Sequence, residues 1–258
     1  MMRVVYFGAA ALMVALSAPA LAQPVVDGSI SGDDYGPAVS VQAVETAWGD
    51  NENELNAAWC TVEGGRLYLA LTGNLQDIFN NLEIFIDSRA GGENDLSGMP
   101  GNDGTSSMAG LSFDAGFAPD FHIFVRHGNS GGDRFLLDIS ELGTPNFSSY
   151  DDVFNGSQEG SGATGTGLNT APIEVGFDNS NTGGVVGGSG AADQGDALAV
   201  QTGLELSIAL ADLGYVSGDI RVCAFVNNTG HNFASNQFLG PLVPPQGALG
   251  SDGAGGFT

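Results

Sequence analysis

Lysine is absent from this 258-residue chain, and its six basic residues are all arginine. Thirty aspartates and glutamates oppose them, so the formal net charge is −24. A surface this acidic repels phosphate backbones and anionic membranes, and we therefore expect neither nucleic acid nor a lipid surface as a partner. The lack of lysine also excludes a phosphate-binding loop that ends in Lys-Ser/Thr. The charge favours cationic partners and calcium-rich or salty water.

Apolar runs long enough to cross a bilayer are missing as well. Residues 1–22 instead have the pattern of a signal peptide, with a positive charge at Arg3, a short apolar stretch at Val4–Leu16 and a small-residue cleavage site at Ala20–Ala22. We therefore predict an exported protein that is secreted or held in the periplasm or at the cell surface. No membrane insertion is expected once the signal is removed.

Cysteine is scarce, and the two cysteines lie in separate apolar runs, Cys60 in Leu55–Val62 and Cys223 in Ile220–Val226. In an exported protein such a pair favours a disulfide, which would close a long loop and stabilise the fold by roughly 3–5 kcal/mol. Two free, buried cysteines that pack as small apolar side chains are the alternative. The sequence leaves both open.

Good helix formers are few and glycine is abundant, with 41 residues, so long surface helices are not expected. Apolar residues alternate with a period of two, as in Arg66–Thr72, where the leucines share one face. Gly64-Gly65 joins this run to Leu55–Glu63 and predicts a tight hairpin, because such turns need positive φ. Further strand-like runs are Ala38–Val44, Leu82–Asp87, Phe121–Arg126, Arg134–Ile139, Pro172–Phe177, Leu204–Leu210 and Ile220–Val226.

Short strands with loop-rich connections predict an all-β fold, an antiparallel β-sandwich of jelly-roll type with long Gly/Asp-rich loops. We assign residues 23–240 to this domain and predict a flexible Gly/Pro-rich C-terminal segment at 241–258. Short helical turns and long loops complete the prediction. The helical turns are expected at Leu75–Asn80 and Leu210–Leu213, and the loops at Ser88–Gly110, Asn155–Thr170 and Asn179–Gly195.

Oxygen-bearing side chains are densest in the glycine-rich loop that follows Ile86. Calcium takes six to eight oxygen ligands from carboxylates, amides and carbonyls, and glycine allows a loop to wrap around the ion. We therefore predict a calcium site here, with a solvated acidic turn as the alternative. Its candidate ligands are Asp87, Glu93, Asn94, Asp95 and Asp103, with Asn102 beside them.

Patterns for catalysis are weak. Gly128–Gly132 formally matches the Gly-x-Ser-x-Gly pattern of hydrolases, but a nucleophile elbow needs a helix after the serine. A strand-like run follows instead, so we place Ser130 on a hairpin turn. His122 and His127 are five residues apart across a strand end, and alternation puts them on opposite faces. We therefore do not expect an enzyme.

Aromatic and polar side chains give a lead toward sugar binding, because flat rings pack on pyranose faces while polar groups contact hydroxyls. Trp48 lies in a polar loop and is expected to be exposed, whereas Trp59 lies in a strand. Tyr68, His122 and Arg126 fall on the strand faces opposite the apolar rows. We predict Trp48, Tyr68, His122 and Arg126 as ligand-binding residues, with scattered surface side chains as the alternative.

Two segments resemble a known family. Val26-Asp27-Gly28 followed by Asp33-Asp34-Tyr35-Gly36 resembles the opening of family-9-type carbohydrate-binding modules and related DOMON-like sandwiches. Gly203–Gly214 is similar to their late strand, in which Gly-x-Glu leads into a turn that ends in Leu-Gly. Through Glu83–Gly92 and Ser235–Leu239 the layout also resembles bacterial exported proteins with a PEP-CTERM tail, although the tail itself is absent from this sequence. The resemblance implies a carbohydrate-binding β-sandwich.

Together these patterns predict a secreted, non-catalytic module that binds a polysaccharide or extracellular matrix polymer and is stabilised by calcium. The alternative is a structural protein of the cell surface or matrix that assembles through calcium-bridged acidic faces. A glycan-active hydrolase is a third hypothesis, and it requires two carboxylates that face each other across a cleft.

Overall fold

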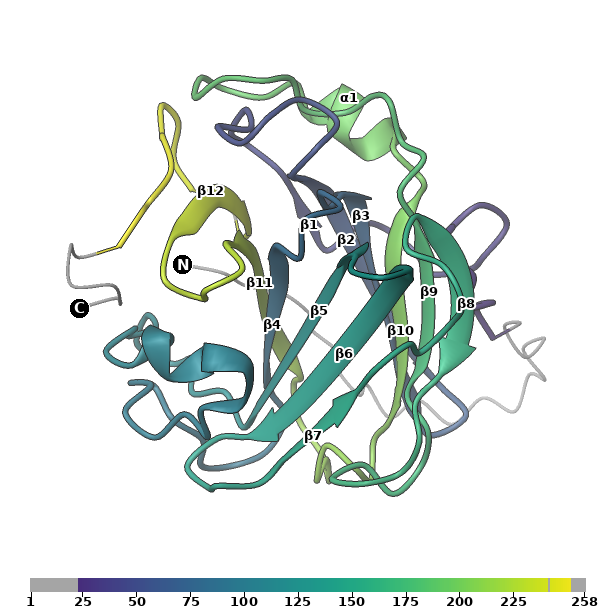
Figure 1. The fold of residues 1–258 in the computed structure, drawn as a ribbon, viewed down its shortest axis with the longest axis vertical. Coiled ribbons are helices and arrows are strands. Elements are labelled where there is room, and N and C mark those ends of the chain that lie inside the picture. Colours follow the sequence, from purple (N-terminus) through teal and green to yellow (C-terminus); the bar gives the residue numbers. More distant parts are fainter. Residues whose placement is uncertain (1–22, 241, 252–258) are drawn as a thin grey trace, which may run out of the picture.

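Two six-stranded antiparallel sheets pack face to face in the computed structural model, which describes residues 23–240 and 242–251 (Figure 1). In spatial order the first sheet contains β1 (Ser40–Val41), β2 (Glu54–Glu63), β3 (Arg66–Asn74), β10 (Gly203–Ala209), β9 (Glu174–Asp178) and β8 (Glu159–Ala163). The second contains β12 (Ala234–Leu239), β11 (Arg221–Asn227), β4 (Asn81–Asp87), β5 (Phe121–Asn129), β6 (Asp133–Glu141) and β7 (Phe147–Tyr150). The predicted all-β sandwich is confirmed. The predicted signal peptide lies outside the described residues.

The main core lies between the sheets and is built by the alternating apolar residues of their central strands. Leu67, Leu69 and Leu71 of β3 supply one side, and Ile84 and Ile86 of β4 belong to the same cluster. All five side chains are almost fully buried. The period-two pattern therefore identified the inward faces correctly.

The predicted hairpin between β2 and β3 is also confirmed. Glu63 pairs with Arg66 across the turn, and Gly64 and Gly65 have φ of 58° and 79°. Both glycines occupy the left-handed region that a two-residue turn of this kind requires, which L side chains rarely adopt. The turn sets the register in which Val62 lies opposite Leu67.

Other elements differ from the prediction. The predicted helical turn at 210–213 is a hydrogen-bonded turn in which the Leu213 N–H donates to the Ala209 carbonyl at 3.3 Å, whereas 75–80 forms no helix. A 3-10 helix, η1, forms at Asn102–Met108 and α1 at Gln194–Ala199. Strands β7, β8 and β12 were not predicted. Strand β8 reads EGSGA and has no apolar alternation, so only its pairing with β9 defines it as a strand. In the part of the chain that the structure describes, neither helix is long and apolar enough to cross a membrane.

Both outer sheet faces are covered by polypeptide, which the sequence pattern did not reveal. On the first sheet Tyr68 packs with Trp59 and Tyr35 beneath the N-terminal segment. On the second sheet Phe85 and Phe225 pack beneath the segment between β4 and β5. Apolar side chains of that segment in contact are Leu96, Met99, Met108, Leu111, Phe113 and Phe117. The molecule therefore has a core on each outer face as well as one between the sheets.

The two cysteines are free. Cys60 lies in the core between the sheets, whereas Cys223 packs on the outer face of the second sheet. A sheet separates the two side chains, so the disulfide considered from the sequence does not form. Burial raises the pKa of the Cys60 thiol to about 12, which keeps this thiol in its unreactive, protonated form.

The C-terminal segment expected to be flexible is hydrogen-bonded to the sandwich in its described part, 242–251. The Asn236 side-chain amide donates to the carbonyl of Gln246 at 2.7 Å, and Ala234 forms a bridge with Gly250. The Gln246 N–H also donates to the carbonyl of Ser189 at 2.9 Å. These contacts fasten the segment to β12.

A buried glutamate on β10 fastens the N-terminal segment to the first sheet. Glu205 Oε2 accepts from the backbone N–H groups of Asp27, Gly28 and Ser29 at 3.0, 2.8 and 3.1 Å. Its other oxygen accepts from the Tyr35 hydroxyl at 2.6 Å. Four donors thus compensate the burial of one carboxylate. The contacts join the two segments that carry the family resemblance.

We predict that Glu205→Ala lowers the free energy of unfolding by about 3 kcal/mol or more, because it leaves several partly buried donors without a partner. Urea unfolding measures the loss. Glu174→Ala on the neighbouring strand β9 is the matched control, since the Glu174 side chain is 48% exposed. Equal losses in the two variants would contradict this role for Glu205.

Candidate functional site

Two aromatic rings from distant loops meet at one end of the sandwich. Trp48 belongs to the loop between β1 and β2, and Phe233 to the loop between β11 and β12. Their ring centroids are 6.0 Å apart and their planes differ by 19°. Phe233 is 42% exposed, whereas Trp48 is half-buried against the main core. We call this pair the ring platform.

Planar polar side chains lie beside the ring platform. Asn53 donates to the Trp48 carbonyl at 3.4 Å and to the side-chain oxygen of Gln76 at 3.1 Å. Gln76 in turn donates to Glu52 at 3.3 Å, and Asn80 donates to Asn53 at 3.2 Å. The loop before β2 and the loop before β4 are thereby joined. Asn53 and Asn80 are almost fully buried and hold these loops together, whereas Gln76 and Glu52 are accessible and are groups of the kind that contact sugar hydroxyls.

A third loop, residues 228–233, completes this end of the molecule. Thr229 donates to the Ile78 carbonyl at 3.2 Å, and the Asn81 side chain donates to the Asn228 carbonyl at 2.7 Å. Ile78 is 52% exposed. Loop 228–233 therefore carries Phe233 while it is tied to the strand and loop around residue 80.

Beneath this loop lies a fully buried carboxylate, Glu83 of β4. Its Oε2 lies 2.7 Å from Nε2 of His122, and its Oε1 lies 2.7 Å from Nδ1 of His231. Asn227 also donates to Oε1 at 3.0 Å. Three buried partners from β5, β11 and loop 228–233 thus converge on one side chain, and we call these four residues the Glu83 centre.

The charges of the Glu83 centre are strongly coupled. Burial alone would lower the pKa of His231, but the carboxylates of Glu83 and Asp103 outweigh burial and raise that pKa to about 9. Burial alone would raise the pKa of Glu83, but His231 and His122 lower it to about 2. An imidazolium on His231 therefore faces a carboxylate on Glu83 at neutral pH.

The four predicted ligand-binding residues do not form one surface. Trp48 belongs to the ring platform, but it is half-buried against the main core rather than exposed as the sequence predicted. Tyr68 is buried on the outer face of the first sheet, and His122 is buried on that of the second, stacked on Phe85 at 4.4 Å. The exposed placement expected for Tyr68 and His122 was wrong, because covering segments bury the outward-facing strand positions.

Arg126 lies on the same outward face of β5 as His122, as alternation predicts, but it is engaged in ion pairs. Its guanidinium lies 2.8 Å from Asp103 and 3.2 Å from Asp138, and it sits over the Phe124 ring. With only 11% of its side chain exposed, Arg126 links η1 to the sheet.

The candidate calcium ligands point toward different partners. Asp87 lies 3.8 Å from Arg221, Asp95 accepts from Ser112 at 3.0 Å, and Asp103 pairs with Arg126. The side chain of Asn94 donates to three carbonyls, those of residues 113, 114 and 117. The buried Oε2 atom of Glu93 has no hydrogen-bond partner. Within the described residues no three His, Cys, Asp or Glu side chains are grouped to hold a metal.

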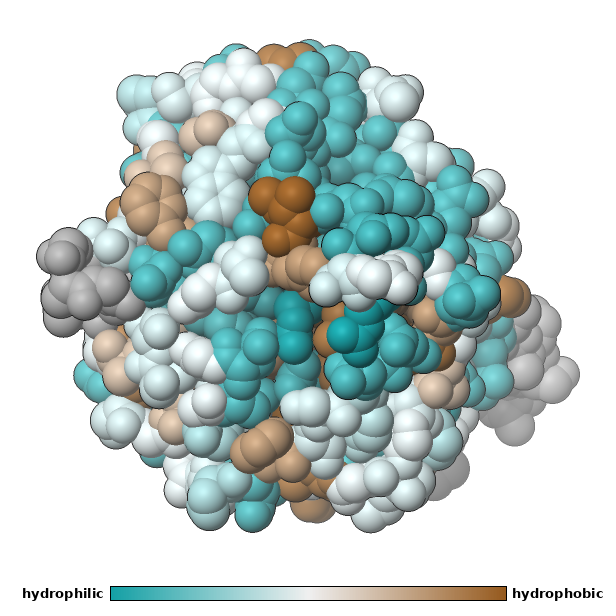
Figure 2. Space-filling view, viewed as in Figure 1, coloured by the Kyte–Doolittle hydropathy of each residue, from teal (hydrophilic) through white to brown (hydrophobic). Residues whose placement is uncertain are grey.

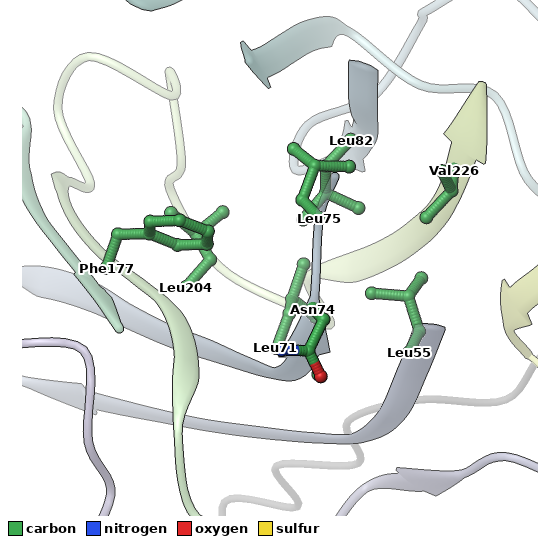
Figure 3. A pocket seen from close by; sticks show the side chains of 9 residues that line it. Leu55, Leu71, Asn74, Leu75, Leu82, Phe177, Leu204 and Val226 are labelled. Carbon is green, nitrogen blue, oxygen red and sulfur yellow. The ribbon is translucent and has the colours of Figure 1, made fainter. Parts of the chain in front are cut away.

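An apolar pocket lies between the two sheets (Figure 3). Its volume is about 10 Å³, hardly enough for one water molecule. Asn74 is the polar side chain among its lining residues, and its amide donates to the carbonyls of Asn179 and Asn181. The remaining lining residues are Leu55, Leu71, Gly73, Leu75, Leu82, Phe177, Leu204 and Val226. This pocket therefore cannot hold a sugar ring.

Ser130 lies in the turn between β5 and β6, where its N–H donates to the Gly132 carbonyl at 3.1 Å. A strand follows this turn, as the sequence predicted. His127 points inward and packs beside Phe135 and Phe177, on the opposite face from His122. The serine and the histidines are therefore not arranged as a nucleophile with its base.

Phe233 and Glu83 were missed from the sequence. Phe233 stands in a polar stretch, Asn-Asn-Thr-Gly-His-Asn, and an exposed aromatic residue in such a stretch is a signal that could have identified it. Glu83 sits at an outward position of a strand, where a solvated carboxylate is the ordinary expectation. The apolar residues of 96–117 were the available sign that this face is covered.

On the face drawn in Figure 2, apolar side chains are scattered among hydrophilic ones and form no broad patch. A ligand on this face would therefore make local apolar contacts rather than cover a large apolar area.

No family model, curated protein or solved structure matches this chain. The resemblance to carbohydrate-binding modules consequently stays a prediction from the two short segments described above.

The Glu83 centre predicts a pH dependence of stability. The pKa of His231 is raised from 6.5 to about 9. The contribution of His231 to the free energy of unfolding is therefore full below pH 6.5 and is lost as the pH rises through 9. The pKa of Glu83 is lowered from 4.5 to about 2, so its contribution is lost as the pH falls from 4.5 through 2. We expect the urea midpoint to fall on both sides of the window between these ranges. In His231→Asn the alkaline decline should disappear, and its persistence would refute the assignment.

Proposed function

We propose that this protein is a secreted, non-catalytic module that binds an uncharged polysaccharide through the ring platform. The observation that carries the proposal is the near-parallel, stacked pair of Trp48 and Phe233 beside Gln76 and Glu52. Phe233 is 42% exposed and can take a flat pyranose face, while the half-buried Trp48 ring supports it from the core.

The charge distribution supports an uncharged ligand. Each arginine in the described residues already faces a carboxylate within 4.0 Å, and carboxylates such as Glu52 and Asp77 stand on the loops of the platform. A polyanion such as a uronic acid polymer would therefore meet repulsion without a free guanidinium to bind it. The arginines and their nearest partners are Arg66 with Glu174, Arg89 with Glu141, Arg126 with Asp103, Arg134 with Asp152 and Arg221 with Asp87.

We predict that Trp48→Ala and Phe233→Ala each weaken binding about tenfold, since one removes the ring that supports the contact and the other the exposed ring itself. The measurement is a pull-down and isotherm on neutral insoluble polymers, namely cellulose, xylan and a β-1,3-glucan, with alginate as the polyanion.

Phe147→Ala is the matched control, because Phe147 is 47% exposed but lies on β7, at the opposite edge of the second sheet from β12. Equal loss in the control, or no binding of any polymer by the wild type, would refute the proposal. Binding of alginate alone would refute its uncharged ligand.

That calcium stabilises the protein remains a prediction from the acidic sequence after Ile86. The test is to compare the melting temperature in millimolar calcium with that in EDTA. If one site in Asp87–Asp103 binds calcium, the melting temperature rises with calcium concentration and Asp95→Asn reduces the rise. Identical melting curves in calcium and EDTA would contradict it.

A further inference from the structure

Phe233 reaches its place on the ring platform through a loop whose centre is buried. His231, two residues before it, is fully buried although loop 228–233 lies at the end of the sandwich. Its φ of 57° is left-handed, a conformation that is uncommon for residues other than glycine. The contact with Glu83 at 2.7 Å turns the imidazole inward and accounts for this backbone geometry.

A second connection runs from the same carboxylate to the backbone of Phe233. Asn227 donates to Glu83 Oε1 at 3.0 Å, and its side-chain oxygen accepts from the N–H of Phe233 at 3.1 Å. The same oxygen accepts from the N–H of Asn228 at 2.9 Å. One amide thus holds the two ends of loop 228–233 together while it is oriented by Glu83.

Side chains from several elements contact the Glu83 centre. From β5, His122 contacts Glu83 directly and Phe124 packs edge-on against His231 at 4.7 Å. From η1, Asp103 lies 3.6 Å from Nε2 of His231 and pairs with Arg126. Within the described residues the charged partners of the His231 ring are Glu83 and Asp103: its Nδ1–H faces Glu83 Oε1, and its Nε2–H faces Asp103.

We propose that Glu83 is a positioning residue for the ring platform: through His231 and Asn227 it holds Phe233 against Trp48, and sugar binding depends on this buried connection. The proposal rests on the function proposed above for the ring platform. It differs from a purely structural role for Glu83, which would lower global stability without changing the relation of Phe233 to Trp48. It also makes binding sensitive to alkaline pH, where His231 loses its proton.

The first test needs no ligand. The chain has two tryptophans, and Trp59 is only 7% exposed, so a Trp59→Phe background leaves Trp48 as the emitting residue. In that background we expect His231→Gly to raise acrylamide quenching of Trp48 about twofold through local opening of the loop. Glycine adopts the left-handed backbone at this position and has no side chain to contact Glu83. Asn227→Ala and Glu83→Gln should act in the same direction.

The control is Glu205→Gln, which alters another buried glutamate, on the opposite sheet, whose hydrogen bonds are with the N-terminal segment. All variants are compared at a urea concentration well below their own midpoints, so that global unfolding does not contribute. Unchanged quenching in folded His231→Gly and Asn227→Ala, or an equal rise in Glu205→Gln, would overturn the proposal.

The second test measures binding to the neutral polymer that the wild type retains most strongly. We expect His231→Gly to weaken binding about tenfold at neutral pH, as loss of a ring contact would. Wild-type affinity should fall as the pH rises through 9, whereas the variant should show no such step. If quenching rises but affinity does not change, the positioning role stands and the ring platform is not the sugar site. If the wild type binds no polymer, only the proposed function fails.

Discussion

A carboxylate can be buried in a protein only when donors surround it, and this chain buries Glu54, Glu83 and Glu205 within its strands. Each recruits donors from segments that are distant in sequence. Glu54 accepts from Asn56 at 2.9 Å and from Asn181 at 2.8 Å, and Glu205 accepts from the N-terminal segment. The loops and covering segments are therefore placed by the need to satisfy these carboxylates, in addition to apolar burial.

This constraint decides where function can lie. Because both sheet faces are covered, the outward strand positions that would line an open sandwich are occupied by buried contacts, as at Tyr68 and His122. Accessible aromatic and polar side chains are found instead at the end of the sandwich, where three loops meet around Trp48 and Phe233. The same burial makes Glu83 available as an anchor, since its partners belong to one of those loops.

Period-two alternation was enough to predict the central strands, the hairpin at Gly64-Gly65 and the inward-facing core, because all three follow from local sequence. Strand β8 was not predictable, because pairing with β9 alone defines it. The site was predictable only in part. Trp48 stood out as an aromatic residue in a polar loop, whereas its contact with Phe233 joins residues far apart in the sequence and depends on the closed fold. The covered faces required the packing of residues 96–117, which resembled a solvated loop.

The order of strands in the sheets has a consequence for how the chain is made. Strand β10 lies between β3 and β9 in the first sheet, and β11 lies between β12 and β4 in the second. Both strands belong to the part of the chain after residue 200. During synthesis from the N-terminus β3 and β9 cannot be joined through β10, and β11 and β12 cannot be added to β4, until that part has emerged from the ribosome. Such non-local pairing slows folding. A nascent chain whose sheets stay incomplete until this late part is made suits transport across a membrane before folding, the route that the first 22 residues predict.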